Sequence, residues 1–553
     1  MQYHRHIEKG SAASRSLAVV LLACCAALVI FGIWFAGFGF DVNDEAYQTM
    51  NAMNPRINPQ AILSSAISHI FGCCFGYSLY SMRVLTFLLT AAAVGCSTIY
   101  FYRSSRDSNR AMLLFILLLA SALCTPTKSR LIGWDCYAVL FTTLSMLSIA
   151  RLWDGGGRWN LVLLGLFGAC ATLSRFPDIV IVPVAILALF LCDDSGRWGG
   201  LRKTAGFLAA YMVAMFLMLC LLYAGDPWQW VVSLRENFVS GHDVGRLVGA
   251  YIHSGRLDLL DIAMLLVFVF VVSRIRGNVW LRYGAYAALF AVVTCVLFLK
   301  IDRMFYSVCR LTTAVTVIMA GIYAMASNRN ERWWSISRAI VIVGCCVVPM
   351  AGSDGGTFKF MALTSIPVCM ALLSHFVPGK RYAEAGLRTT WTILLSTALA
   401  MPFFTAAHTT FDGGWLNARH TVDHPLLQGN TTTEARAAEI NEMIEEGRRV
   451  VPDSPLVIGH NNRRFFSEYL WGSRNELWPH SWDDRIFDDE DKIDLLLEAI
   501  RSGAVGDIVF AKYGANDSCD FERNPMRDAI EATGLYRSED YRWFVVFRRM
   551  PSE

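Results

Sequence analysis

The dominant pattern in this chain is a series of continuous apolar runs separated by short polar segments. A run of about 18 or more apolar residues is long enough to cross the hydrocarbon layer of a bilayer as a helix. The runs do not alternate apolar and polar residues, so they indicate helices rather than the strands of a barrel. We expect about thirteen spans, at 17–37, 82–102, 111–125, 135–150, 160–174, 178–192, 204–223, 258–273, 279–299, 310–326, 338–352, 359–376 and 388–406.

The polar segments predict the orientation of the spans. Basic residues gather in RSSRDSNR, RLWDGGGRWN, DDSGRWGGLRK, SRIRGN, SNRNERWWSISR and PGKRYAEAGLR, which is the signature of cytoplasmic loops. The first apolar run is too long for a cleaved signal peptide, so we interpret it as a retained helix with a cytoplasmic N-terminus. We favour a bacterial plasma (inner) membrane. The outer side then receives the loop after the first span, a long loop at 224–257 and the C-terminal tail.

The tail at 407–553 predicts a separate, soluble α/β domain outside the membrane, after a transmembrane domain at 1–406. Helical and strand patterns follow one another along it. We expect helices at 432–451, 463–472 and 492–503, and strands at 454–460, 506–513 and 542–549.

Composition agrees with a membrane protein, since 54% of the residues are hydrophobic and only 17% are charged. The net charge of +3 hides an asymmetry. The tail holds 27 acidic and 17 basic residues, and the first 406 residues hold 19 acidic and 32 basic. A basic membrane part suits anionic membrane lipids, and we expect no nucleic-acid partner.

Candidate chemistry begins where the first span ends, in FGFDVNDEAYQTM. This stretch carries Asp41, Asp44, Glu45 and Tyr47. The carboxylates can simply solvate a helix end, or they can serve a substrate that arrives through the membrane. Asp135 opens the fourth span, where a helix N-cap is the alternative, and GSDGGTFK contains Asp354.

Cations accompany these acids on the predicted outer face, namely Lys128, Arg130, Arg175, Lys300, Arg303, Arg310 and Lys359. A carboxylate near several cations suits a transferase whose donor is a lipid phosphate. The carboxylate accepts a proton from the incoming group, and the cations balance the phosphate that leaves. Nonspecific binding of lipid headgroups is the alternative for any single cation.

DVNDEAYQ and RLIGWDCYAVLFTTLSMLSIA, with about a dozen spans and an outer C-terminal domain, resemble the GT-C glycosyltransferases. The branch in question contains the protein O-mannosyltransferases and the lipid A aminoarabinose transferase. The resemblance implies a polyprenyl-phosphate sugar donor and a saccharide, glycolipid or protein acceptor. It also implies that Asp44 activates the acceptor, that Glu45 assists, and that Asp135 orients the acceptor or the sugar. The other residues named above would then bind substrate.

A divalent metal stays open at this stage, because Asp41, Asp44 and Glu45 supply oxygen ligands that suit Mg²⁺ or Mn²⁺. Two other functions also stay open. A transporter or flippase for a lipid-linked saccharide would be expected to show paired repeats, and the spans show none. A polysaccharide polymerase or ligase would use a long outer loop such as 224–257.

Overall fold

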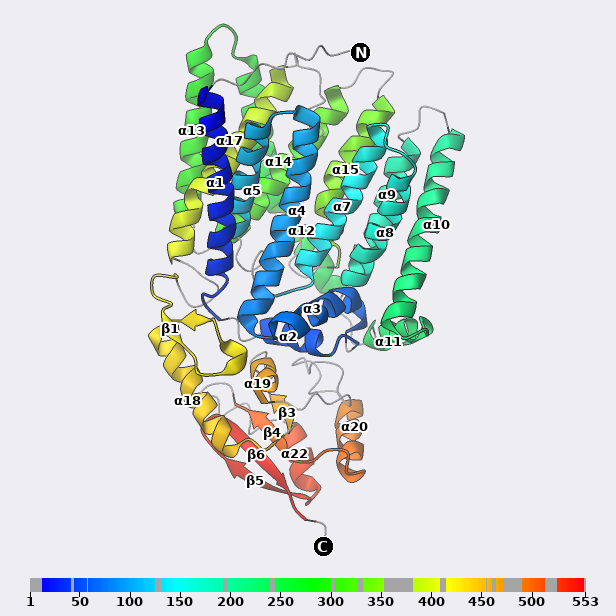
Figure 1. Cartoon of the computed structure of the whole chain (residues 1–553), viewed down its shortest axis with the longest axis vertical. Coiled ribbons are helices and arrows are strands. Elements are labelled where there is room, and N and C mark those ends of the chain that lie inside the picture. Colours follow the sequence, from blue (N-terminus) through cyan, green and yellow to red (C-terminus); the bar gives the residue numbers. More distant parts are fainter. Residues whose placement is uncertain are drawn as a thin grey trace. The chain divides into compact units, whose positions relative to one another are not determined.

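A computed structural model describes most of the chain, which is mainly helical with strands near the C-terminus (Figure 1). The described residues are 12–40, 44–56, 58–124, 132–191, 197–238, 244–299, 304–326, 332–352, 381–407, 414–453, 455–459, 464–471, 490–512 and 525–551.

Long apolar helices form the membrane part of the protein. Six of the described helices are long and apolar enough to cross a membrane: Ser16–Phe35, Leu79–Ser105, Asp135–Trp153, Trp198–Leu222, Val279–Leu299 and Arg381–Ala407. The other predicted spans also coincide with helices, except 359–376, which lies outside the described residues. The chain is therefore a helical membrane protein, and the count of about thirteen spans stays a prediction.

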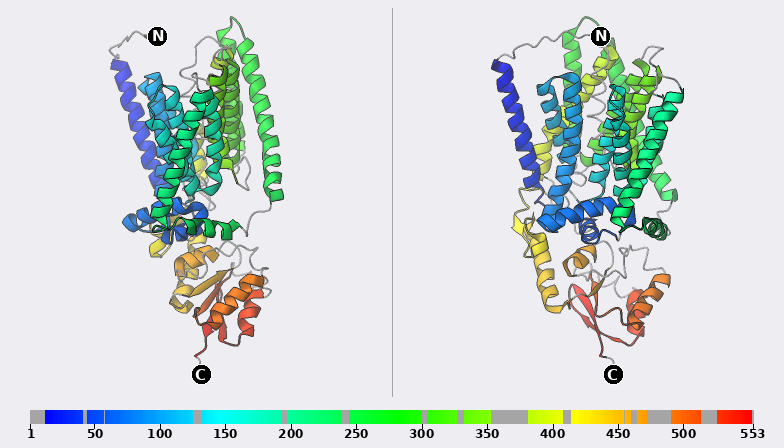
Figure 2. Two further views of the ribbon diagram at one scale, coloured as in Figure 1. Left: turned by 90° about the vertical axis from the view of Figure 1, so that its right-hand side faces the viewer. Right: turned by 45° about the vertical axis from the view of Figure 1, so that its right-hand side comes forward.

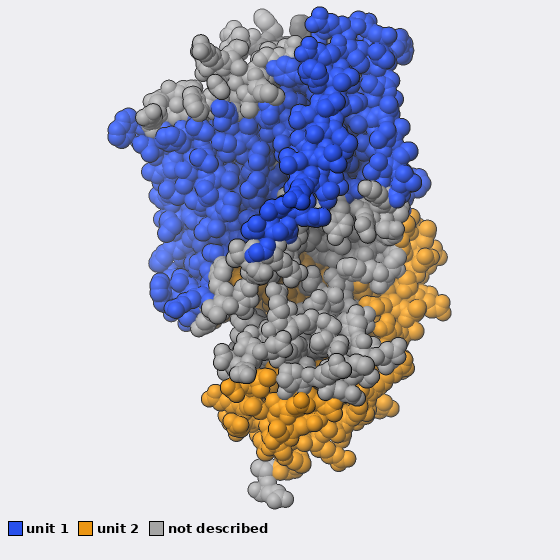
Figure 3. All heavy atoms as spheres, turned by 180° about the vertical axis from the view of Figure 1, so that it is seen from behind, with its two compact units in different colours: residues 1–35, 87–129, 135–405 blue, residues 36–86, 130–134, 406–553 orange. Residues whose placement is uncertain are grey.

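The chain divides into two compact units (Figure 3). Unit 1 holds Met1–Phe35, Phe87–Ser129 and Asp135–Thr405, and unit 2 holds Ala36–Thr86, Arg130–Trp134 and Ala406–Glu553. This division differs from a cut between residues 406 and 407, because Ala36–Thr86 and Arg130–Trp134 cluster with the tail. The predicted pair of domains stays a prediction.

Most helices of unit 1 run alongside one another, whereas α11 lies across the end of α10 (Figures 1 and 2). The helices of unit 1 are α1 (Ala12–Phe35), most of α4 (Leu79–Ser105), α5 (Ser108–Leu123), α7 (Asp135–Trp153), α8 (Trp159–Ser174), α9 (Ile181–Leu191), α10 (Arg197–Leu222), α11 (Trp228–Phe238), α12 (Val244–Arg274), α13 (Val279–Leu299), α14 (Met304–Ala326), α15 (Arg332–Met350) and α17 (Arg381–Ala407).

Helix α8 packs against both α7 and α10. Gly165 makes the contact with α10 close, because a Cβ atom at this position would lie only 2.6 Å from Ala210 Cβ and from the backbone N of Tyr211. Small residues allow helices in a membrane to approach in this way.

The predicted long loop at 224–257 is wrong. Helix α11 occupies Trp228–Phe238, and α12 begins at Val244 rather than near 258. The polar residues of VGRLVGAYIHSGRLDLL hid this extension, since they lower the mean hydropathy although the backbone continues as a helix.

Unit 2 combines the first part of the chain with the tail. Its helices are α2 (Asp44–Met53), α3 (Ile62–Phe75), the first turns of α4, α18 (Glu434–Val450), α19 (Arg464–Trp471), α20 (Glu490–Arg501) and α22 (Pro525–Ala532). One apolar cluster joins Phe40, Leu79 and Met82 to Ile440 and Tyr469. The tail therefore packs against residues near the first candidate carboxylates.

A four-stranded sheet lies in the tail, in the order β3 (Leu456–Gly459), β4 (Ile508–Ala511), β6 (Phe544–Arg549) and β5 (Tyr536–Asp540). Strands β3 and β4 are parallel, and the other two pairs are antiparallel. Successive residues point to opposite faces, so that Ile508 and Phe510 join one core cluster and Val509 joins another. A two-stranded ladder joins β1 (His420–Thr421) to β2 (Thr431–Thr432).

Candidate functional site

Two of the candidate carboxylate residues, Asp44 and Glu45, open α2 in unit 2. Glu45 and Arg83 are both fully buried, and they form a two-point ion pair. Arg83 Nε donates to Glu45 Oε1 at 2.7 Å, and Arg83 Nη2 donates to Glu45 Oε2. The backbone N of Ile132 lies 3.4 Å from Oε1 and adds a third donor. The carboxylate of Glu45 is thus satisfied by protein groups.

The same guanidinium group also holds the end of the first span. Arg83 Nη1 donates to the carbonyl oxygens of Ala36, Phe38 and Gly39 at 3.1, 3.1 and 2.7 Å. Gly39 has a φ of 75°, a left-handed conformation that glycine adopts without strain. Arg83 therefore fixes the backbone on both sides of the segment that carries Asp41.

Asp44 is the first residue of α2, directly before Glu45, so its backbone position follows from the ion pair. Tyr47 is one turn further along the helix. Its hydroxyl accepts a hydrogen bond from Asn58 Nδ2 at 3.2 Å, and its ring packs edge-on against Trp134. Tyr47 also packs against the apolar cluster of unit 2, so its ring is held in place.

A second group of charged residues lies in unit 1, around Arg175. Arg175 Nη1 donates to Asp178 Oδ1 at 2.7 Å, and Arg175 Nε lies 3.6 Å from Asp135 Oδ1. The guanidinium group also donates to the carbonyl oxygens of Pro349 and Ala351 at 2.9 and 2.6 Å. Arg175 is buried, so it connects the start of α7, the end of α8 and the end of α15 in an environment of low dielectric.

Arg310 is also paired within unit 1. Its Nη2 donates to Asp261 Oδ1 at 2.9 Å and to the carbonyl oxygen of Leu257 at 3.1 Å. The pair joins α14 to α12. Both Arg175 and Arg310 thus have an acidic partner, and their charge is largely balanced by the protein.

The remaining predicted site residues lie outside the described residues: Asp41, Lys128, Arg130, Lys300, Arg303, Asp354 and Lys359. The side chain of Asp44 also belongs to this group, although its backbone is described.

A metal role for Glu45 does not fit this arrangement, because both of its oxygens face the guanidinium group of Arg83. Within the described part of the chain, no group of three or more His, Cys, Asp or Glu residues is placed to hold a metal ion. Asp41 and Asp44 therefore stay as the predicted oxygen ligands, and a metal stays a prediction.

Sequence reasoning missed Arg83, Asp178 and Asp261. Arg83 had a usable signal, since a charged residue inside an apolar run is costly unless it is paired. Its partner Glu45 is 38 residues away, and no local pattern joins the two.

A match to a protein-family model includes most of the candidate site residues. Residues 36–230 match the model of the dolichyl-phosphate-mannose-protein mannosyltransferases. The predicted resemblance to this glycosyltransferase family is confirmed. The matched range contains Asp44, Glu45, Arg83, Asp135 and Arg175, whereas Arg310 and Asp354 lie beyond it.

The match over residues 36–230 agrees with the predicted class, a membrane glycosyltransferase with a lipid-linked sugar donor. It does not favour the transporter or the polymerase.

Similar solved structures have low sequence identity to this chain. The archaeal oligosaccharyltransferase AglB from Archaeoglobus fulgidus, in complex with an inhibitory peptide and a dolichol-phosphate, has a TM-score of 0.44 at 11% identity, over 98% of this chain and 76% of that one. ArnT from Cupriavidus metallidurans, bound to undecaprenyl phosphate, has a TM-score of 0.43 at 12% identity, over 98% and 99%. Similarity at this level does not extend to mechanism. No curated protein sequence matches the chain.

Proposed function

We propose that the chain transfers a sugar from a polyprenyl-phosphate donor to a saccharide, glycolipid or protein acceptor at the outer face of a plasma membrane. The catalytic base is Asp44. In this proposal about thirteen spans cross the membrane, the N-terminus is cytoplasmic, and residues 407–553 form an extracytoplasmic α/β domain.

The proposed chemical step inverts the anomeric carbon. The Asp44 carboxylate takes the proton of the acceptor group, and the freed electron pair attacks the sugar from the side opposite the phosphate. The bond between the anomeric carbon and the phosphate oxygen breaks, and the polyprenyl phosphate leaves with that electron pair. Cations near the leaving phosphate stabilise its charge.

The ion pair between Arg83 and Glu45 carries the assignment of Asp44. It lies within the range that matches the mannosyltransferase family, and it fixes the backbone on both sides of Asp41–Asp44. A base must be held in position to be efficient, and a buried two-point ion pair is a rigid support. Glu45 then acts as a positioning residue rather than as a second base.

The proposed roles of the cations differ. Arg175 and Arg310 already have acidic partners, so we assign them to holding helices together. Asp135 touches Arg175 and shares this role with orienting the substrate. Lys128, Arg130, Lys300, Arg303 and Lys359 are left to bind the donor phosphate, with Asp354 and Tyr47 near the acceptor.

Sugar transfer by the purified protein tests the proposal directly. We expect wild-type protein to transfer sugar from synthetic polyprenyl-phosphate donors, and the D44N variant to be slower by about 10²- to 10⁴-fold, the usual range for loss of a general base. The matched control is D226N, because Asp226 is exposed and lies inside the same family range.

Undiminished transfer by D44N would remove Asp44 as the base. An equal loss of transfer rate in D226N would show that removal of any carboxylate slows sugar transfer. It would leave no special role for the start of α2.

A further inference from the structure

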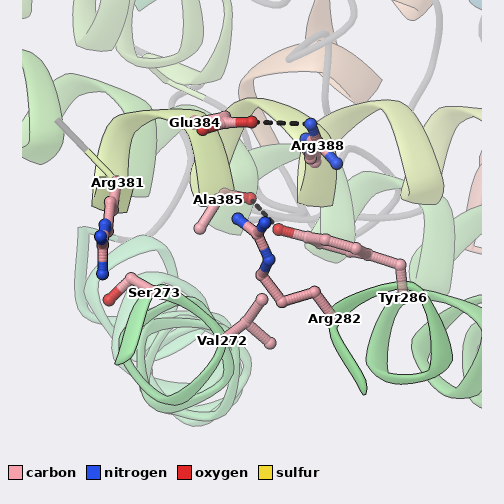
Figure 4. Close-up of a pocket in the computed structure, with 8 residues that line it drawn as sticks. All are labelled: Val272, Ser273, Arg282, Tyr286, Arg381, Glu384, Ala385 and Arg388. Atoms are coloured by element: carbon pink, nitrogen blue, oxygen red, sulfur yellow. Dashed lines mark hydrogen bonds and ion pairs between the residues drawn. The ribbon is translucent and has the colours of Figure 1, made fainter. Parts of the chain in front are cut away.

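A pocket rich in arginine lies where three helices of unit 1 meet (Figure 4). The end of α12 contributes Val272 and Ser273. The start of α13 contributes Arg282 and Tyr286, and the start of α17 contributes Arg381, Glu384, Ala385 and Arg388. The enclosed space of the pocket is only about 10 Å³, and the pocket is partly open to solvent, so a ligand group would lie at its mouth. None of these residues belongs to the candidate active site.

Positive charge exceeds negative charge in this pocket. Arg388 Nη2 donates to Glu384 Oε1 at 2.7 Å, so the single carboxylate of the lining is already shared with one guanidinium group. Arg282 and Arg381 have no ion-pair partner among the described residues. Two helices also begin here, and their N-terminal amides add positive potential.

Arg282 offers an unused donor at this site. Its Nε atom is buried and has no hydrogen-bond partner within the described part of the chain. Its guanidinium group points toward α17 (Figure 4), where Tyr286 donates a hydrogen bond to the carbonyl oxygen of Ala385 at 3.4 Å. A buried donor without a partner is unfavourable, so the pocket is incomplete without an acceptor.

The surroundings of the pocket are those of a lipid interface. Trp280 is 84% exposed, and Tyr283 and Leu281 are also more than half exposed on the first turns of α13. Exposed aromatic residues at the end of an apolar helix are typical of the headgroup region. The flanking segments SRIRGN and PGKRYAEAGLR belong to the loops whose basic residues predict the cytoplasmic side. Anionic lipids are attracted to basic groups at that side.

We propose that this pocket binds the phosphate group of an anionic membrane phospholipid. Guanidinium groups pair with phosphate oxygens in a fork geometry, and three of them line this pocket from two helices. The acyl chains then lie along the exposed apolar surface of α13. This site does not depend on the transfer reaction, and its bound lipid is not consumed.

A binding titration tests the site. Short-chain phosphatidylglycerol is added to the full-length protein in neutral detergent, and the shift in melting temperature gives an apparent affinity. Phosphatidylcholine of the same chain length is the neutral probe. We expect phosphatidylglycerol to raise the melting temperature and phosphatidylcholine to have little effect. In R282Q/R381Q/R388Q the affinity falls about fivefold per lost guanidinium group, as expected for about 1 kcal/mol for each basic residue.

The matched control is R103Q/R158Q/R202Q, which removes the same charge from exposed positions in other predicted cytoplasmic segments. It should bind phosphatidylglycerol as the wild type does. Equal losses in the two triple variants would overturn the proposal in favour of a nonspecific charge effect. Equal shifts with both lipids in the wild type would overturn it as well.

Two further arms complete the test. Inorganic phosphate at the same concentration should have little effect, and an equal shift would reassign the pocket to a free anion. If the triple variant does not fold, R282Q alone removes the unpaired group and keeps the pair of Arg388 with Glu384. An unchanged affinity in R282Q would then contradict the proposal.

Discussion

Arg83 shows how much one buried side chain can organise. Its guanidinium group contacts Glu45 and three carbonyl oxygens, and the residue has no exposed surface. A charge buried in this way is stable only while its partner is present. The candidate site is therefore expected to be most sensitive to substitution of single buried charged residues.

Replacement of Arg83 by methionine should be strongly destabilising. R83M leaves the Glu45 carboxylate buried without its partner, and we expect the free energy of unfolding to fall by about 3–5 kcal/mol. Chemical denaturation in detergent, followed by circular dichroism, measures this change.

The double variant R83M/E45M distinguishes the cost of an unpaired buried charge from the cost of losing the ion pair, since it removes both charged residues. It should recover most of the stability lost in R83M while transfer stays low, because Asp44 is no longer positioned. The partly exposed pair of Arg527 with Glu531 is the control, where E531Q should cost less than about 1 kcal/mol. A cost as large as that of R83M would contradict a special role for burial.

At this scale the sequence predicted the residue types well but not their partners. DVNDE and Asp135 stood out because charge next to an apolar run is unusual. The partners Arg83, Asp178 and Asp261 became visible only after folding, since a contact between distant segments leaves no mark in local periodicity.

The helices follow closely from the sequence because the hydrocarbon layer requires apolar residues and internally satisfied backbone groups. The predicted helix bounds are wrong where polar residues continue a helix, as in the first turns of α12. Helix packing is less predictable, although small residues such as Gly165 mark close contacts.

A leucine at Gly165 tests the packing of α8 against α10. The added side chain meets Ala210 and the backbone of Tyr211, so G165L must push the helices apart. We expect a loss of about 1–3 kcal/mol, the usual effect of overpacking, seen as a lower melting temperature in detergent.

Gly284 provides the control, because no atom lies within 4 Å of a Cβ at this position. G284L should melt close to the wild type. An unchanged melting temperature for G165L would mean that α8 and α10 are not in close contact in the protein.

For the whole molecule, the described contacts make the tail an integral part of unit 2. The Tyr469 hydroxyl lies 2.7 and 3.0 Å from the carbonyl oxygens of Tyr77 and Leu426 and shares its one proton between them, and its burial raises the pKa of the phenol well above its usual value. The alternation of patterns predicted strands and helices in the tail, but nothing in it predicted which earlier segment they would contact.

Deletion of residues 414–553 should therefore do more than remove a domain. Phe40, Leu79 and Met82 would lose the apolar side chains of α18 and α19 that cover them. We expect poor yield, aggregation in detergent and loss of transfer, although Asp44 is retained. Size-exclusion chromatography and the transfer assay measure these effects. Deletion of residues 551–553 is the control and should leave both unchanged. A truncated chain that is monodisperse and active would contradict this prediction.

The short pairing between the exit of the first span and β2 has a consequence for biosynthesis. Gly39 N donates to the carbonyl oxygen of Thr431, and Thr431 N donates to the carbonyl oxygen of Gly37, both at 2.8 Å. The carbonyl oxygen of Tyr77 likewise accepts its hydrogen bond from Tyr469, which follows 392 residues later in the chain. The loop with Asp44 is therefore translated long before the segments that contact its neighbours. The native surroundings of that loop can form only after Thr431 and Tyr469 have been translated.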